Sequence, residues 1–91
     1  MRITFDPVKD AWNIEERDLP FERVAELDWD ASLVIEDLRE NYGESRFAVY
    51  AKLGDRLHVA IVTFRNGATH VISFRKANKR EIRFYDRRRG G

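Results

Sequence analysis

The dipeptide Asn66-Gly67 stands between two runs of strand-forming residues and constrains the fold more than any other feature of the sequence. Both residues tolerate the positive φ angles of a type I′ turn, which joins two antiparallel strands in a tight hairpin. The preceding run, Leu57 to Phe64, is apolar at nearly every position, as in a central strand that is covered on both faces. The following run, His70 to Phe74, supplies the returning strand. The sequence therefore predicts a hairpin at the centre of a β-sheet.

A further strand is predicted immediately before this hairpin, because polarity alternates along residues Arg46 to Leu53. Alternate side chains of a strand point to opposite faces, so one face should be apolar and the other partly exposed. The apolar face consists of Phe47, Val49, Ala51 and Leu53. Gly54-Asp55 then turns the chain into the hairpin. Together these patterns predict a three-stranded antiparallel meander.

The N-terminal part of the chain carries two helical patterns. Asp6-Pro7 provides an N-cap carboxylate and a proline at the first helical position, and the helix that follows should pack on the core through an apolar stripe. That stripe consists of Val8, Ala11 and Trp12. After a break at Asp18-Leu19-Pro20, the same spacing recurs and predicts a second short helix, through Phe21, Val24 and Ala25. Short strands are expected at Met1 to Phe5 and at Ser32 to Asp37.

The last helix is predicted to begin at Asn78, because Glu81 three residues later completes a capping box. Ile82 and Tyr85 would dock this helix on the sheet, and basic residues at spacings of four, three and four would share its opposite, exposed face. These basic residues are Lys76, Arg80, Arg83 and Arg87. The patterns together predict one α+β domain over residues 1–91, with two N-terminal helices and the basic C-terminal helix packed on an antiparallel sheet.

Charge is distributed unevenly along the chain, although the 17 Lys and Arg nearly balance the 16 Asp and Glu. From Ser73 to Gly91 there are eight basic residues and two acidic ones, whereas Met1 to Ile72 carries nine basic and fourteen acidic residues. This asymmetry indicates a basic surface attached to an acidic body. RNA, DNA or an acidic protein would be attracted to such a surface, and a solvated, fraying helix is the alternative that involves no partner.

Several classes of protein are disfavoured by what the sequence lacks. There is no cysteine for a disulfide framework or a thiolate metal site, and no glycine-rich phosphate loop. His58 and His70 lie inside expected strands without a partner at metal-ligand spacing, and Ser73 has no nucleophile elbow. No segment has the apolar length of a signal peptide or a membrane span. We expect a soluble cytoplasmic protein that needs no metal or other cofactor and does not bind membranes.

Several segments, taken in order, resemble the BrnT toxins of bacterial type II toxin-antitoxin systems. Phe5-Asp6-Pro7-Val8-Lys9 is similar to the opening F-D-P-x-K of that family, and Gly43 to Phe47 is similar to its G-E-E-R-F. Thr63-Phe64-Arg65 resembles T-x-R, and Val71 to Glu81 resembles I-S-A-R-K-A-T-x-R-E. The chain departs from the family pattern K-H-G-V-S-F, since Glu16 to Phe21 contains no histidine. Phe74 also replaces the small residue that precedes the arginine of the signature.

This resemblance implies a RelE-like fold and a metal-independent endoribonuclease that inhibits translation. It also implies a small BrnA-like antitoxin that neutralises the toxin and forms with it a complex that binds operator DNA. The positions that it marks as catalytic are Arg65, Arg75, Lys76, Lys79 and Arg80. Arg83 and Arg87 would bind RNA farther along the basic helix.

Roles for these residues follow from the chemistry of RNA cleavage by its own 2′-hydroxyl. The arginines suit a phosphate and its transition state because the guanidinium fork matches phosphate oxygens and stays charged. Lys76 or Lys79 could serve as an acid or base. Two alternatives remain: a noncatalytic module whose basic surface binds nucleic acid or an acidic antitoxin, and a purely structural interaction domain.

Overall fold

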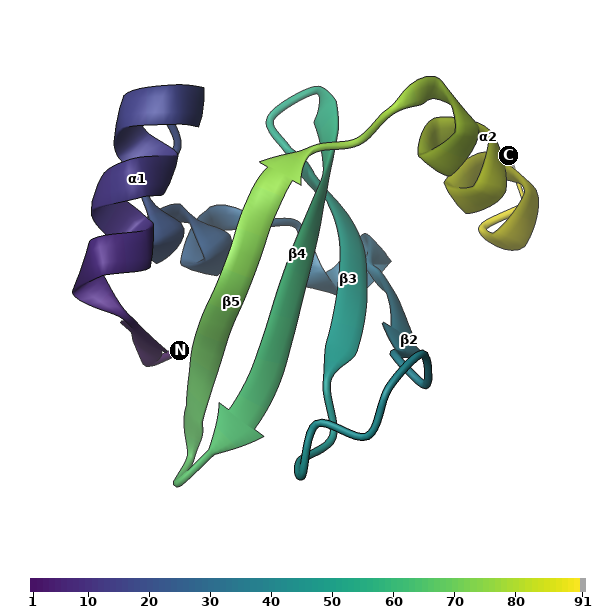
Figure 1. Cartoon of the computed structure of the whole chain (residues 1–91). Helices are drawn as coiled ribbons and strands as arrows, with labels where there is room; N and C mark the ends of the chain where they lie inside the picture. Colours follow the sequence, from purple (N-terminus) through teal and green to yellow (C-terminus); the bar gives the residue numbers. More distant parts are fainter. Residues whose placement is uncertain (91) are drawn as a thin grey trace.

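Five strands form one mixed sheet in the computed structural model, which describes residues 1–90 (Figure 1). The elements in chain order are strand β1 (Ile3–Phe5), helix α1 (Pro7–Arg17), the 3-10 helices η1 (Phe21–Glu26) and η2 (Trp29–Ala31), strands β2 (Leu33–Glu36), β3 (Phe47–Leu53), β4 (Arg56–Arg65) and β5 (Ala68–Lys76), and helix α2 (Lys79–Arg88). The strands lie in the order β1-β5-β4-β3-β2. An α+β fold is therefore confirmed.

The β4–β5 hairpin forms at the predicted turn, and β4 is the central strand of the sheet. Asn66 and Gly67 both have positive φ, at 50° and 75°, as the turn requires. The prediction of a wholly antiparallel sheet is wrong, because β1 pairs with β5 in parallel, with Ile3 beside Thr69. Residues 6–67 separate these two strands, so no local turn signal fixes their relative direction.

The main core lies between the 3-10 helices and one face of the sheet. Phe21 and Val24 of η1 are buried against Val49, Val62 and Phe74 of the three central strands. Instead of the predicted second α-helix, the chain forms two 3-10 helices, and η1 ends after only six residues. The indole of Trp29 donates a 3.0 Å hydrogen bond to the carbonyl of Val24 and ties η2 back to η1. A tight 3-10 helix presents side chains at every third position, which suits a short segment laid across a sheet.

Helix α1 is attached to the sheet by polar groups rather than by the predicted apolar stripe. Val8 and Trp12 are 76% and 52% exposed, and Ala11 is exposed as well. The side chain that α1 buries is Asn13, whose amide donates to the carbonyls of Leu19 and Phe74 at 2.8 and 3.0 Å. The apolar periodicity was misleading because α1 lies beside the edge of β5, where backbone carbonyls need donors.

Helix α2 covers part of the opposite face of the sheet, as predicted from Ile82 and Tyr85. These side chains pack with Leu57 and Val59 of β4, and the Tyr85 hydroxyl donates a 2.7 Å hydrogen bond to the carbonyl of Ala31. The capping box between Asn78 and Glu81 is also formed. The basic stripe is shorter than predicted, because Lys76 belongs to β5 and only Arg80, Arg83 and Arg87 share the exposed face of the helix.

Candidate functional site

A groove of about 600 Å³ lies on the part of the sheet face that α2 leaves uncovered. Its floor is a row of cross-strand neighbours, in which Ala48 of β3 faces Ile61 of β4 and Ile61 faces Ser73 of β5. Two of these three side chains are small, so the floor is hollow. A β-bulge between Ile61 and Val62 shifts the register of β5 at this point, and Ile72 and Ser73 both line the groove as a result. We call this hollow the sheet-face groove.

One end of the sheet-face groove is closed by an ion pair between β5 and α2. Arg75 makes two parallel hydrogen bonds of 2.8 Å to the carboxylate of Glu81. The same carboxylate accepts a 2.9 Å bond from the backbone N–H of Asn78, so the helix cap also orients the ion pair. The Arg75 guanidinium lowers the pKa of Glu81, and Glu81 raises the pKa of Arg75. The groove therefore holds an ionised carboxylate beside a fixed, partly exposed arginine fork.

Tyr50 lines the groove in the same cross-strand row as Arg75, with Val59 of β4 between them. Burial, together with the negative charge of Glu81, raises the pKa of its phenol, so Tyr50 is a neutral hydroxyl near neutral pH. Its ring also packs on Phe84 of α2, with the ring centroids 5.3 Å apart. The groove thus combines an acid, a cation, a phenol and the hydroxyl of Ser73.

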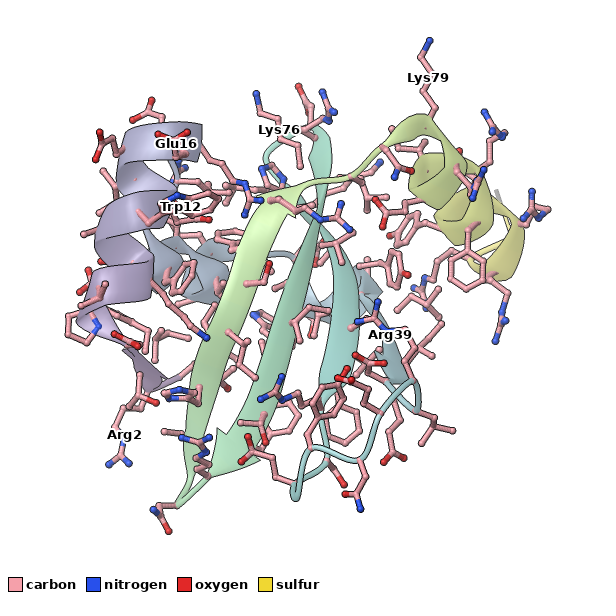
Figure 2. The ribbon with its side chains drawn as sticks, in the orientation of Figure 1. Arg2, Trp12, Glu16, Arg39, Lys76 and Lys79 are labelled. Carbon is pink, nitrogen blue, oxygen red and sulfur yellow. The ribbon has the colours of Figure 1, made fainter. Side chains whose placement is uncertain are left out.

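The segment between β2 and β3 forms the other wall of the groove. Arg39 makes two 2.8 Å hydrogen bonds to Asp37, whose carboxylate also accepts from the hydroxyl of Tyr42 at 3.1 Å. The bonds from Arg39 hold the pKa of Asp37 well below its usual range. The Arg46 guanidinium lies 4.1 Å from the centre of the Tyr42 ring. Figure 2 shows Arg39 on the β2 side of the sheet, away from Lys76 and Lys79.

The structure does not gather the predicted catalytic residues into one site. Arg75 lines the groove, and its cross-strand neighbour on β4 is Val59. Arg65 lies on β4 as well, six residues beyond Val59. At roughly 3.3 Å per residue, that separation is about 20 Å. Arg65 is bound to Glu44 at 2.9 and 3.1 Å, and Glu44 raises its pKa. These two arginines would therefore contact different phosphates of an extended ligand.

The predicted lysines and the arginines of α2 point away from the groove. Lys76 is on the opposite face of β5 from Arg75, and Lys79 projects into solvent at the start of α2 (Figure 2). The helix arginines that were predicted as catalytic or RNA-binding are all exposed, namely Arg80, Arg83 and Arg87. Conversely, sequence reasoning missed Glu81 and Tyr50 as site residues. The sequence indicates only a capping role for Glu81, and its spacing of six from Arg75 is no signal of an ion pair.

Comparison with known proteins identifies the family. The sequence model described as "Ribonuclease toxin, BrnT, of type II toxin-antitoxin system" matches residues 5–81. The chain belongs to this BrnT family. The predicted resemblance is thereby confirmed, and the chain is a ribonuclease toxin of the type that has an antitoxin partner. The matched region of the BrnT family includes Arg75 and Glu81 but ends before Arg83 and Arg87.

A solved structure supports the same fold. The BrnT ribonuclease toxin of Brucella abortus superposes with a TM-score of 0.68 and is 22% identical in sequence; the match covers 87% of this chain and 99% of that chain. A comparison with curated protein sequences finds no match. Within residues 1–90, no three His, Cys, Asp or Glu side chains gather as a bound metal ion would require. None of the helices in the described part of the chain is long and apolar enough to cross a membrane.

Proposed function

We propose that this BrnT-family toxin cleaves RNA in the sheet-face groove without a metal ion and thereby inhibits translation. The observation that carries the proposal is the pair of Arg75 and Glu81 at the wall of the groove. Transesterification by the 2′-hydroxyl requires a base for the hydroxyl proton and a cation for the phosphorane oxygens. An ionised carboxylate and a guanidinium fork fixed side by side supply both groups.

The reaction would begin when a phosphate of the RNA competes with Glu81 for Arg75. As the Arg75 fork turns to the phosphate oxygens, the Glu81 carboxylate loses the bonds that lower its pKa and becomes a stronger base. Glu81 then takes the 2′-hydroxyl proton, the 2′-oxygen attacks phosphorus, and the bond to the 5′-oxygen breaks to leave a 2′,3′-cyclic phosphate. The leaving oxygen takes its proton from water.

Other cations would hold the rest of the RNA. Arg65 lies at the far end of the same face of β4, and Arg80, Arg83 and Arg87 offer an exposed stripe on α2. Each such contact releases counterions, so RNA binding should weaken steeply with salt. We further propose that a BrnA-like antitoxin neutralises the toxin and that their complex binds operator DNA, and that the fold is related to that of RelE.

Incubation of RNA with purified protein in EDTA tests the proposal. Wild-type protein should produce fragments that end in 2′,3′-cyclic phosphate, and Arg75→Gln and Glu81→Gln should each reduce the rate by about 100-fold or more. Arg2→Gln and Glu15→Gln are matched controls, because both side chains are exposed and lie outside the groove. If RNA binds but stays intact at high protein excess, the noncatalytic binding module is the correct alternative.

A further inference from the structure

A second hollow, of about 370 Å³, lies on the opposite face of β5 from Arg75. It is formed where the end of α1, the start of η1 and the turn between β3 and β4 meet at one end of the sheet. Three basic side chains line it together with one histidine and one carboxylate. They are Arg17, Arg23, Lys76, His58 and Asp18, and we call this hollow the cation pocket.

The cations of this pocket are incompletely neutralised. Lys76 is exposed and makes no ion pair with the residues that the structure describes. Arg17 is held in place by a 2.8 Å bond to the Asn13 side-chain oxygen and by the Trp12 ring 4.9 Å away, and neither partner carries negative charge. Arg23 pairs with Glu26 at 3.3 Å, but both side chains are about half exposed, so solvent screens the pair. The pocket therefore has a positive potential.

His58 is a largely buried residue of this pocket with one ring nitrogen that lacks a partner. The residue is only 3% exposed, and its Nδ1 lies 2.9 Å from the carbonyl oxygen of Arg56. A carbonyl can only accept, so Nδ1 carries the hydrogen and Nε2 carries the lone pair in the neutral ring. Within residues 1–90, Nε2 has no hydrogen-bond partner, and it is not sealed from solvent. An acid or a hydrogen-bonding anion could therefore engage it.

The surroundings keep the His58 ring neutral when the pocket is empty. Burial is the largest cause that lowers its pKa, followed by the positive charges of Arg56, Lys76 and Arg23, although the bond to the Arg56 carbonyl acts in the opposite direction. Arg17 lines the pocket as a further cation, and Asp18 is the carboxylate that lines it. An anion bound among these cations would reverse the sign of the local field. Nε2 would then take up a proton and donate it in a hydrogen bond to the anion.

We propose that the cation pocket binds a phosphate group of the RNA chain, next to the part of the chain that lies in the sheet-face groove. Arg75 and Lys76 are successive residues of β5 and point to opposite faces of the sheet. An RNA chain that crosses the end of β5 would contact Arg75 in the sheet-face groove and Lys76 in the cation pocket. The identity of the ligand rests on the proposed ribonuclease function, whereas the phosphate site is testable without any cleavage.

The test follows the imidazole signals of the full-length protein by NMR during pH titration, in phosphate and in chloride at equal ionic strength. The pKa of His58 should rise by about one unit in saturating phosphate, which corresponds to tenfold tighter binding to the protonated form. His70 is an internal control, because it lies toward the hairpin end of β5 and bonds to the Thr4 hydroxyl. Lys76→Gln should abolish the shift, whereas Lys9→Gln, which removes an exposed lysine outside the pocket, should not.

A second arm replaces inorganic phosphate with a 2′-O-methyl RNA decamer, which has no free 2′-hydroxyl within the chain and resists cleavage. The same rise in the pKa of His58, at decamer concentrations at least 10-fold below those of inorganic phosphate, would support the proposal. A shift with inorganic phosphate alone would identify a site for free phosphate and overturn the assignment to RNA. If neither ligand raises the pKa of His58, the pocket binds no phosphate. Failure of the ribonuclease proposal would appear separately, as intact RNA in the cleavage assay.

Discussion

Asn13 shows how one polar residue can decide where a helix lies. Its buried amide bonds to the carbonyls of Leu19 and Phe74, and its oxygen accepts from Arg17. Asn13→Ala would leave the Leu19 carbonyl without that donor, so the free energy of unfolding should fall by about 2–3 kcal/mol. Urea denaturation measures the change. Val8→Ala on the same helix should stay within about 0.5 kcal/mol because Val8 is largely exposed. Equal effects of the two variants would contradict the polar attachment of α1.

The positions of Arg65 and Arg75 predict different kinetic effects of two similar substitutions. Arg75→Gln should lower kcat, because Arg75 lies beside Glu81 in the groove. Arg65→Gln, about 20 Å away at roughly 3.3 Å per residue, should raise KM several-fold, leave kcat unchanged and reduce the salt dependence of binding. Initial rates on a defined RNA over a range of salt concentrations separate these effects. A loss of kcat in Arg65→Gln as large as that in Arg75→Gln would place Arg65 at the reacting phosphate.

At the scale of the elements, the first turn of α2 couples folding to the site. The capping box joins Asn78 and Glu81, and the Glu81 carboxylate also binds Arg75. Asn78→Ala should cost about 1 kcal/mol of stability through the lost cap. It should also lower RNA cleavage, because the backbone N–H of Glu81 loses its bond to the Asn78 side chain and the first turn of α2 holds Glu81 less firmly. Lys79→Ala, at the next position, is the control, since its exposed side chain makes no such bond. Urea denaturation and the cleavage assay should therefore both distinguish the two variants; unchanged cleavage in Asn78→Ala would contradict the coupling.

At the scale of the whole molecule, stability should fall with acidification in two stages. Burial lowers the pKa values of His58 and His70 below 6.5, so the unfolded chain takes up protons first and stability decreases as pH falls from 6.5 through the folded values. Arginine partners lower the pKa values of Glu44 and Glu81 below 4.5, so the stability from these carboxylates is present above pH 4.5 and is lost as pH falls through their folded values.

Urea midpoints measured from pH 8 to pH 3 test both stages. Glu81→Gln should weaken the fall below pH 4.5, and His58→Gln should weaken the fall that begins near pH 6.5. A midpoint that stays constant between pH 7 and pH 5 would contradict the contribution of the histidines.

The sequence by itself determined the features that depend on neighbouring residues. Asn66-Gly67 set the hairpin because the turn needs positive φ at two successive positions. The capping box of Asn78 and the alternating face of β3 could also be predicted, because each depends on residues that are close together in the sequence. The order of four motifs along the chain also sufficed to predict the BrnT family, which the match over residues 5–81 confirmed.

Only the tertiary structure decided which distant residues meet. The parallel pairing of β1, the polar attachment of α1 and the replacement of an α-helix by η1 and η2 all depend on which surface each segment packs against. Charge along the sequence likewise placed the cations at the C-terminal end, but β5 sends Arg75 and Lys76 to opposite faces. The alternation of side chains along β5 thus divides one basic segment between two hollows. The tertiary structure also brings Glu81 to Arg75 and Lys76 to His58, and no local sequence pattern predicts these two pairs.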